Sequence, residues 1–256
     1  MNKKNPHLFK LIKNLVRLLY PKMDVDGLHN LPDEACVIVG NHTQLHGPIS
    51  CELYFPDKCY TWCAAQMMEL KEVPSYAYKD FWSHKPKLLK PFFKLVSYII
   101  SPLSVLIFNN ARTIAVFRDN RILSTFRESI AKMKDGNNIV IFPEHDKIHN
   151  HIIYDFQEGF VDIARLYYKR TGKELSFVPL YIAPKLKKMY LGKPIQFSSN
   201  TPISEERRRI CDYLMKEITD IAVGLPEHTV IPYRNVPKKY YPLNTKKEEN
   251  DESTCC

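Results

Sequence analysis

The chain has 256 residues, with 37 Lys and Arg against 28 Asp and Glu, and therefore a formal net charge of +9. Its 45% hydrophobic and 25% charged residues are typical of a globular protein and exclude wholesale disorder. The length fits one large or two small domains, and the basic excess indicates an anionic partner, namely nucleic acid, lipid headgroups or a phosphorylated substrate.

Residues 1–23 are predicted to form a basic amphipathic helix. Asn5 suits the N-cap and Pro6 the first helical position, and no acidic residue precedes Asp24 although the segment carries several lysines and an arginine. A helical wheel separates the apolar side chains from the basic ones. Such a helix either lies on a membrane surface or packs its apolar face on the protein's own core with its basic side in solvent.

Short apolar segments alternate with amphipathic ones through residues 24–240, the extent that we predict for the main domain. We predict strands at 35–39, 59–64, 112–117, 138–142, 175–181 and 189–197, and helices at 47–54, 122–133, 160–170 and 205–223. This alternation predicts an α/β fold, with a mixed, largely parallel sheet flanked by helices. Residues 241–256 are predicted to be a charged, disordered tail.

The most apolar stretch covers residues 92–108 but includes Lys94 and Pro102. Because a membrane-spanning helix needs about 20 apolar residues, we expect an interfacial segment or a core helix here rather than a span. The N-terminal segment lacks the small-residue cleavage site of a signal peptide, and seven cysteines without a C-x-x-C pair favour a reducing compartment. We therefore expect a cytoplasmic protein that associates peripherally with a membrane lipid surface, and no nucleic-acid partner because no zinc-finger or RNP signature is present.

Polar side chains follow several of the predicted strands. His42 follows the first strand, Arg118 the third and Glu144 the fourth, and Pro179 lies inside the next. Open α/β sheets place their sites at the carboxyl ends of the strands. A histidine, an arginine and a glutamate gathered there would supply a base, a phosphate clamp and a positioning carboxylate.

The order and spacing of these segments resemble a known family. Asn41-His42, residues 112–118, Phe142-Pro143-Glu144 and residues 177–180 resemble the four sequence blocks of glycerolipid acyltransferases, the PlsC-like lysophosphatidic acid and glycerol-3-phosphate acyltransferases. The resemblance implies transfer of a fatty acyl group from a thioester donor, acyl-CoA or acyl-ACP, to the hydroxyl of a lysophospholipid or glycerol phosphate. The donor is a co-substrate, and no cofactor is implied.

The same resemblance implies roles for individual residues. His42 would be the general base that takes the proton of the acceptor hydroxyl. Arg118 would hold the acceptor phosphate by bidentate hydrogen bonds, and Glu144 would position the acceptor or its loop. The remaining residues expected at the substrate are Asn41, His46, Gly47, Pro143, His145 and Pro179.

One block departs from the family pattern. The family reads H-x4-D, and its Asp fixes the tautomer of the imidazole, but this chain has Gly47 at that position. An unexpected carboxylate, Asp146, follows Glu144. We hypothesise that Asp146, or failing that Glu144, crosses the site to orient His42 and is thus part of the catalytic set. The alternatives are an unoriented His42 or a catalytically impaired homologue that binds lipid.

A metal-dependent hydrolase is a further alternative. His42 and His46 are four residues apart, and His145, Asp146, His149 and His151 lie close in sequence. Such side chains ligate zinc or iron. No H-E-x-x-H pattern is present, and we therefore expect no metal site.

Overall fold

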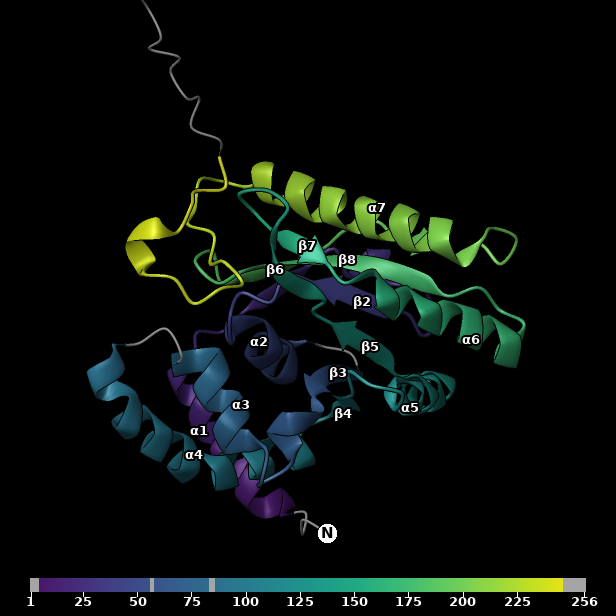
Figure 1. Ribbon diagram of the computed structural model, residues 1–256. Coiled ribbons are helices and arrows are strands. Elements are labelled where there is room, and N and C mark those ends of the chain that lie inside the picture. The colour runs from purple at the N-terminus through teal and green to yellow at the C-terminus, as the bar shows by residue number, and fades with distance from the viewer. Residues whose placement is uncertain (1–4, 56–57, 83–85, 246–256) are drawn as a thin grey trace, which may run out of the picture.

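The computed structural model describes residues 5–55, 58–82 and 86–245. Within these residues one mixed sheet has the strand order β1-β9-β8-β2-β5-β3-β4, and β10 pairs with β8 (Figure 1). The strands of this sheet are β1 (Asp24–Asp26), β2 (Val37–Gly40), β3 (Cys59–Ala64), β4 (Thr113–Val116), β5 (Asn138–Ile141), β8 (Ser176–Ala183), β9 (Lys188–Leu191) and β10 (Ile195–Gln196). A separate antiparallel pair consists of β6 (Glu144–Ile148) and β7 (Tyr154–Phe156).

The centre of the sheet is parallel. β8, β2, β5, β3 and β4 all run in one direction, whereas β9 and β10 run antiparallel to β8. The predicted α/β class with a mixed, largely parallel sheet is therefore confirmed. The predicted strand at 189–197 is in fact two strands, because the pairing with β8 is interrupted after Leu191 and resumes at Ile195 with its register shifted by one residue.

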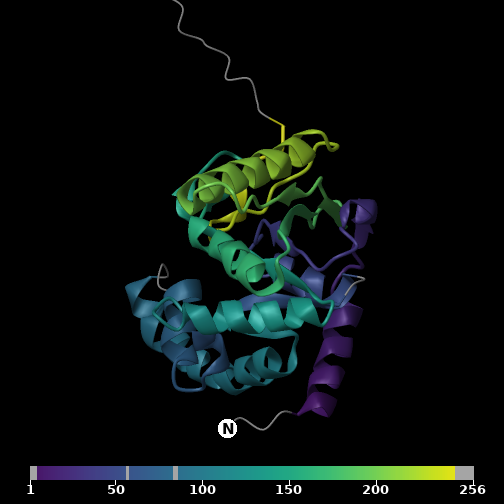
Figure 2. The same ribbon diagram turned by 90° about the vertical axis from the view of Figure 1, so that its right-hand side faces the viewer.

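Helices cover both faces of this sheet. They are α2 (His46–Tyr54), α3 (Val73–Ala77), α5 (Ile122–Lys134), α6 (Asp162–Thr171) and α7 (Ile203–Val223), with α1 and α4 described below. Alternate residues of β2 separate the two halves of the core, since Val37 and Val39 pack with α5, α6 and α7, whereas Ile38 packs with α2. Figures 1 and 2 both show α7 at the end of the molecule opposite α1 and α4.

The apolar stretch at residues 92–108 lies in one unbroken helix, α4 (Lys90–Asn110), which passes through Pro102. This helix turns its polar side inward: Ser97, Ser101 and Ser104 are buried, and Ser101 is only 2% exposed. Its large apolar side chains point outward, with Ile99 67% exposed. Residues 87–110 are long and apolar enough to cross a membrane by length and composition, with a mean hydropathy of 1.7.

The predicted N-terminal helix is present as α1 (Pro6–Leu19), and Asn5 caps it by accepting a hydrogen bond from the Leu8 amide at 3.1 Å. It packs on the domain through a mixed side on which Phe9, Ile12, Lys13 and Val16 are half-buried; Lys13 pairs with Glu52, and Arg17 donates to the Leu53 carbonyl at 2.9 Å. Its leucines are exposed, up to 83% for Leu18. One edge of the apolar face therefore meets the domain, and the leucine edge is left uncovered.

The chain after α7 does not begin its tail at residue 241. Asn244 is fully buried, and Leu243 forms a β-bridge with Thr229. Residues 241–245 therefore belong to the folded domain, because their backbone is tied to the segment that follows α7. The rest of the predicted tail, residues 246–256, lies outside the described residues, as do residues 1–4 of the N-terminal segment.

Candidate functional site

The loop after β2 carries His42 and is held from both sides. The buried Asn41 side chain bonds the backbone of Ile182 twice, accepting from its amide at 2.7 Å and donating to its carbonyl at 3.1 Å. Thr43 and Gln44 then adopt left-handed conformations, with φ of 45° and 56°, which turn the chain sharply. Because both polar groups of Asn41 are used in the fold, it anchors the loop and is not free for a substrate.

Glu144, at the start of β6, fixes the same loop from the neighbouring strand. One carboxylate oxygen accepts from the His42 amide at 2.6 Å and the other from the Tyr154 amide at 3.0 Å. The carboxyl group is buried, and this burial raises its pKa to about 7, against a smaller lowering by the two amides. Glu144 thus positions the backbone of His42, and its oxygens contact amides rather than the imidazole.

Two aromatic rings enclose the His42 imidazole. Phe142 lies edge-on at 5.3 Å between ring centroids, and Tyr233 lies edge-on at 5.8 Å. The Nδ1 atom is buried and has no hydrogen-bond partner among the described residues. Burial lowers the pKa of His42 to about 4, against a smaller raising effect of the Gln44 and His42 backbone, so the imidazole is neutral at pH 7. A neutral imidazole is the form that accepts a proton as a general base.

Gly47 closes the loop, since its amide donates to the His42 carbonyl at 3.1 Å. A Cβ atom here would lie 2.6 Å from that carbonyl oxygen and 3.0 Å from a ring carbon of Phe142. The position where the family has Asp is therefore closed to a side chain in this conformation. The absence of a side chain at Gly47 and the close approach of Phe142 belong to one local arrangement.

The structure does not place Asp146 against His42. Its exposed carboxylate accepts from the Arg234 guanidinium at 3.1 Å. The orienting contact that we hypothesised for Asp146 is thus absent from the described residues, because its partner is an arginine on the segment after α7. Glu144, the second choice, does contact His42, but through the backbone amide.

Arg118 follows β4 and is exposed at the rim of a surface depression of about 410 Å³. Its positive charge lowers the pKa of Asp80, whose carboxyl pKa is raised above its usual range mainly by burial. The same charge lowers the pKa of Tyr233, although burial raises that pKa overall. Arg118 therefore lies in electrostatic reach of Tyr233, the residue whose ring lies edge-on to His42.

The other expected substrate residues have partners within the protein. His46, the first residue of α2, bonds the Tyr20 hydroxyl through Nδ1 at 2.7 Å. His145 points toward Asp155, with 3.8 Å from Nε2 to the carboxylate. Pro143 is buried, and its carbonyl accepts from the Gln157 amide at 2.9 Å. These contacts turn His46 and His145 to neighbouring elements, and Pro143 shapes the turn between β5 and β6.

Pro179 was expected at the substrate and lies elsewhere. It is a buried residue of the central strand β8, in register with Val39 of β2. A Cβ at Gly192 would lie 2.8 Å from the Pro179 ring, so the ring packs closely on the segment between β9 and β10. The expectation of a substrate contact is corrected, since the ring is enclosed by neighbouring backbone in the sheet.

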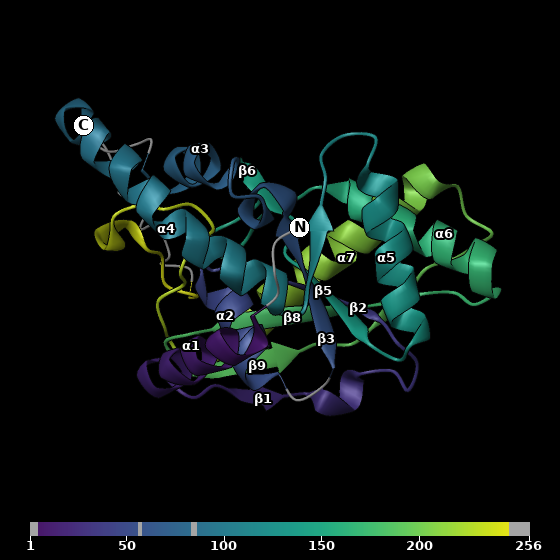
Figure 3. The ribbon, with the colours of Figure 1, turned by 90° about the horizontal axis from the view of Figure 1, so that it is seen from below.

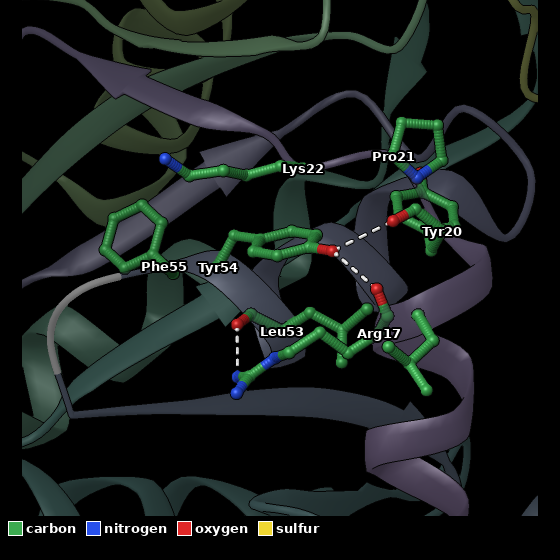
Figure 4. Close-up of a pocket in the computed structure, with 8 residues that line it drawn as sticks. Arg17, Tyr20, Pro21, Lys22, Leu53, Tyr54 and Phe55 are labelled. Atoms are coloured by element: carbon green, nitrogen blue, oxygen red, sulfur yellow. Dashed lines mark hydrogen bonds between the residues drawn. The ribbon is translucent and has the colours of Figure 1, made fainter.

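Another surface depression, of about 790 Å³, is not at His42. Leu53, Tyr54 and Phe55 line it at the carboxyl end of α2, the opposite end from His46 (Figure 4). Arg17 and Tyr20 line its other side, where the Tyr54 hydroxyl donates to the Tyr20 carbonyl at 3.0 Å. This depression follows the junction between α1 and the domain.

The histidines considered as metal ligands do not converge. Across residues 5–55, 58–82 and 86–245, no group of three or more His, Cys, Asp or Glu side chains is arranged to hold a metal ion. His151 instead contacts the Asn244 carbonyl at 3.1 Å through Nε2. His145 is turned instead toward Asp155.

Sequence reasoning missed Tyr233 and Asp80. Tyr233 lies in an irregular segment far from His42 in the chain, and Asp80 lies in a single π-helical turn, Tyr78–Trp82. Neither belongs to a periodic pattern or to a strand end, the two signals that located His42, Arg118 and Glu144.

Comparison with known proteins gave one kind of match. No protein-family model matches the chain, and no curated protein matches its sequence. Among solved structures, the 1-acyl-sn-glycerophosphate (LPA) acyltransferase PlsC from Thermotoga maritima is similar, with 14% identical residues and a TM-score of 0.49. The similarity covers 86% of this chain and 81% of that chain.

Proposed function

We propose that this protein is a glycerolipid acyltransferase, which moves a fatty acyl group from acyl-CoA or acyl-ACP to the hydroxyl of a lysophospholipid or glycerol phosphate. The observation that carries the proposal is the meeting of a neutral His42, a buried Glu144 that holds its backbone, and Arg118 at one edge of a parallel sheet. The four sequence blocks supply these residues in the order of the family.

In the proposed reaction, His42 takes the proton of the acceptor hydroxyl as the oxygen attacks the thioester carbonyl. The new ester bond forms as the carbon–sulfur bond breaks, and the thiolate leaves with the proton that His42 returns. Arg118 binds the acceptor phosphate through its guanidinium. No acyl-enzyme is required, because the thioester is already an activated acyl group.

The test is transfer of labelled acyl groups by the purified full chain to a panel of lysolipids and glycerol phosphate. We expect His42→Ala to abolish transfer, and Arg118→Ala to raise the KM for phosphorylated acceptors with a smaller effect on kcat. Transfer by His42→Ala at the wild-type rate would refute the role of this residue. Absence of transfer with any donor and acceptor would favour the impaired, lipid-binding homologue, for which the unpartnered Nδ1 is the specific observation.

We also propose that the protein lies on the cytoplasmic face of a membrane through α1 and α4. The two helices pack beside each other at one end of the molecule, and Figure 3 shows them from that end. Both turn large apolar side chains outward, and the exposed set is Leu11, Leu15, Leu18 and Leu19 of α1 with Phe92, Leu95, Tyr98 and Ile99 of α4. Exposed apolar side chains on two neighbouring helices that also carry lysines fit an anionic lipid surface.

Vesicle binding tests this placement. Leu95→Glu together with Ile99→Glu places two carboxylates on the outward side of α4, and we expect binding to anionic phospholipid vesicles to weaken at least about tenfold. Leu123→Glu is the matched control, since Leu123 is an exposed leucine of α5. Unchanged binding of the α4 variant would contradict the placement, and equal binding to neutral vesicles would contradict the part assigned to the lysines.

A further inference from the structure

The segment that follows α7, residues 226–245, crosses the carboxyl edge of the sheet, and we call it the strap. It is the yellow loop beside β6 in Figure 1. Asn244 secures its base, because its side chain donates to the Ala222 carbonyl at 2.8 Å and accepts from the His228 amide at 2.7 Å. His228 is itself buried and bonds the Tyr181 hydroxyl at 2.8 Å.

The tip of the strap is fastened to the His42 loop. The Gln44 side chain donates to the Arg234 carbonyl at 3.3 Å and bonds the Tyr241 hydroxyl at 2.9 Å. Arg234 pairs with Asp146 of β6 at 3.1 Å. These bonds bring the strap to both elements that flank the imidazole, and they fix Tyr233 between them.

Tyr233 contacts two rings at once. It lies 5.8 Å from the His42 ring at 81°, and 5.7 Å from the Tyr154 ring at 58°. Phe142 contacts the His42 imidazole at 69°. Edge-to-face pairs of this kind have a preferred geometry and therefore restrict the rotation of a ring.

We infer that Tyr233 is a positioning residue, which together with Phe142 orients the His42 imidazole. In the family that the motifs resemble, a carboxylate performs this task. Two observations support this beyond the ring contacts. Nδ1 has no partner among the described residues, and Gly47 cannot carry a side chain without meeting Phe142 and the His42 carbonyl. The catalytic consequence rests on the proposed function, but the ring geometry does not.

Side chains of β6 and of the strap lie against His42. Glu144 of β6 meets the His42 amide, and Tyr233 of the strap meets the ring. The charges of Asp80, Asp146, Arg118 and Glu144 act on the Tyr233 hydroxyl. A change at Tyr233 that keeps these charges therefore tests the enclosing ring.

The experiment compares Tyr233→Ala with Tyr233→Phe, which keeps the ring, and with Tyr240→Ala, which removes an exposed tyrosine of the same strap. For acyl transfer we expect Tyr233→Ala to lower kcat about 5- to 10-fold with little change in KM, in keeping with the loss of one aromatic pair. Tyr233→Phe and Tyr240→Ala should stay within about twofold of wild type.

A second measurement does not need activity. The His42 ring is titrated by NMR, with its signal assigned by its loss in His42→Ala. In Tyr233→Ala, water reaches the ring, and the pKa should rise from about 4 toward the ordinary 6.5, whereas Tyr233→Phe should leave it low.

An unchanged His42 pKa in Tyr233→Ala would overturn the inference. If wild type is active, a Tyr233→Ala variant with the wild-type kcat would overturn it as well. A Tyr233→Phe variant that shows both the lower kcat and the raised His42 pKa of Tyr233→Ala would overturn it too, because the hydroxyl would then be responsible. If wild type transfers no acyl group, the proposed function fails and the titration alone decides the role of Tyr233.

Discussion

Glu144 and His42 are expected to impose opposite pH dependences on stability. Burial raises the pKa of Glu144 from 4.5 to about 7, so the folded protein binds more protons than the unfolded chain in this interval. Stability due to Glu144 therefore falls as pH rises from 4.5 to 7, in contrast to the usual carboxylate. Across this pH interval the free energy of unfolding due to Glu144 changes by about 3 kcal/mol.

His42 has the reverse effect. Its pKa falls from 6.5 to about 4 in the folded protein, so the unfolded chain binds more protons and stability rises with pH across that interval. This change also amounts to about 3 kcal/mol. Between pH 4.5 and 6.5 the two contributions offset each other, and the wild-type profile conceals both.

Removing one partner should reveal the other. The Glu144→Gln variant lacks the contribution of Glu144. The free energy of unfolding of this variant minus that of wild type should therefore grow by roughly 1 kcal/mol for each pH unit from 4.5 to 7. Urea denaturation of both proteins at several pH values measures this difference, and all other titrating groups cancel in it. A difference independent of pH would refute the reasoning. In His42→Asn, the free energy of unfolding should instead fall with rising pH over the same range.

Two further changes probe the packing around the site. Gly47→Ala should lower the free energy of unfolding by about 1–3 kcal/mol, because its Cβ meets the His42 carbonyl oxygen at 2.6 Å. Gly159→Ala is the control, with no atom within 4 Å of the added Cβ, and equal melting temperatures of the two variants would contradict the overlap. Asn244→Ala should cost about 2–4 kcal/mol in urea unfolding, since it leaves buried backbone groups of the strap unpaired. A loss below about 1 kcal/mol would mean that water replaces those bonds.

Strand positions were predictable wherever burial produced a short apolar run. The run at 59–64 matches β3, and the residues after β2, β4 and β5 place His42, Arg118 and Glu144 at one edge because these strands are parallel. The β6–β7 hairpin was not predicted, because it carries mixed polar residues and its register is irregular. Local pattern therefore located the buried strands and the amphipathic helices, but not the irregular β6–β7 pair.

The orientation of α1 and α4 was predictable only in part. Amphipathicity identified α1, but it does not tell which apolar side chains meet the domain; the structure half-buries Phe9, Ile12 and Val16 and leaves the leucines exposed. In α4, Pro102 suggested an interruption, yet the helix continues through it. The inward serines of α4 are informative only once the fold shows which side meets the domain.

Gly47, at the position where the family that the motifs resemble has Asp, is part of a closely packed local arrangement. Placing Asp there would require the carbonyl of His42 and the ring of Phe142 to move, because both lie within 3.0 Å of the new Cβ. Moving Phe142 would in turn remove one of the two rings that enclose His42. The other ring, Tyr233, comes from a strap whose base depends on Asn244 and whose tip depends on Gln44. The geometry of the imidazole is thus coupled to the C-terminal segment of the domain, and a carboxylate added at position 47 alone could not replace that coupling.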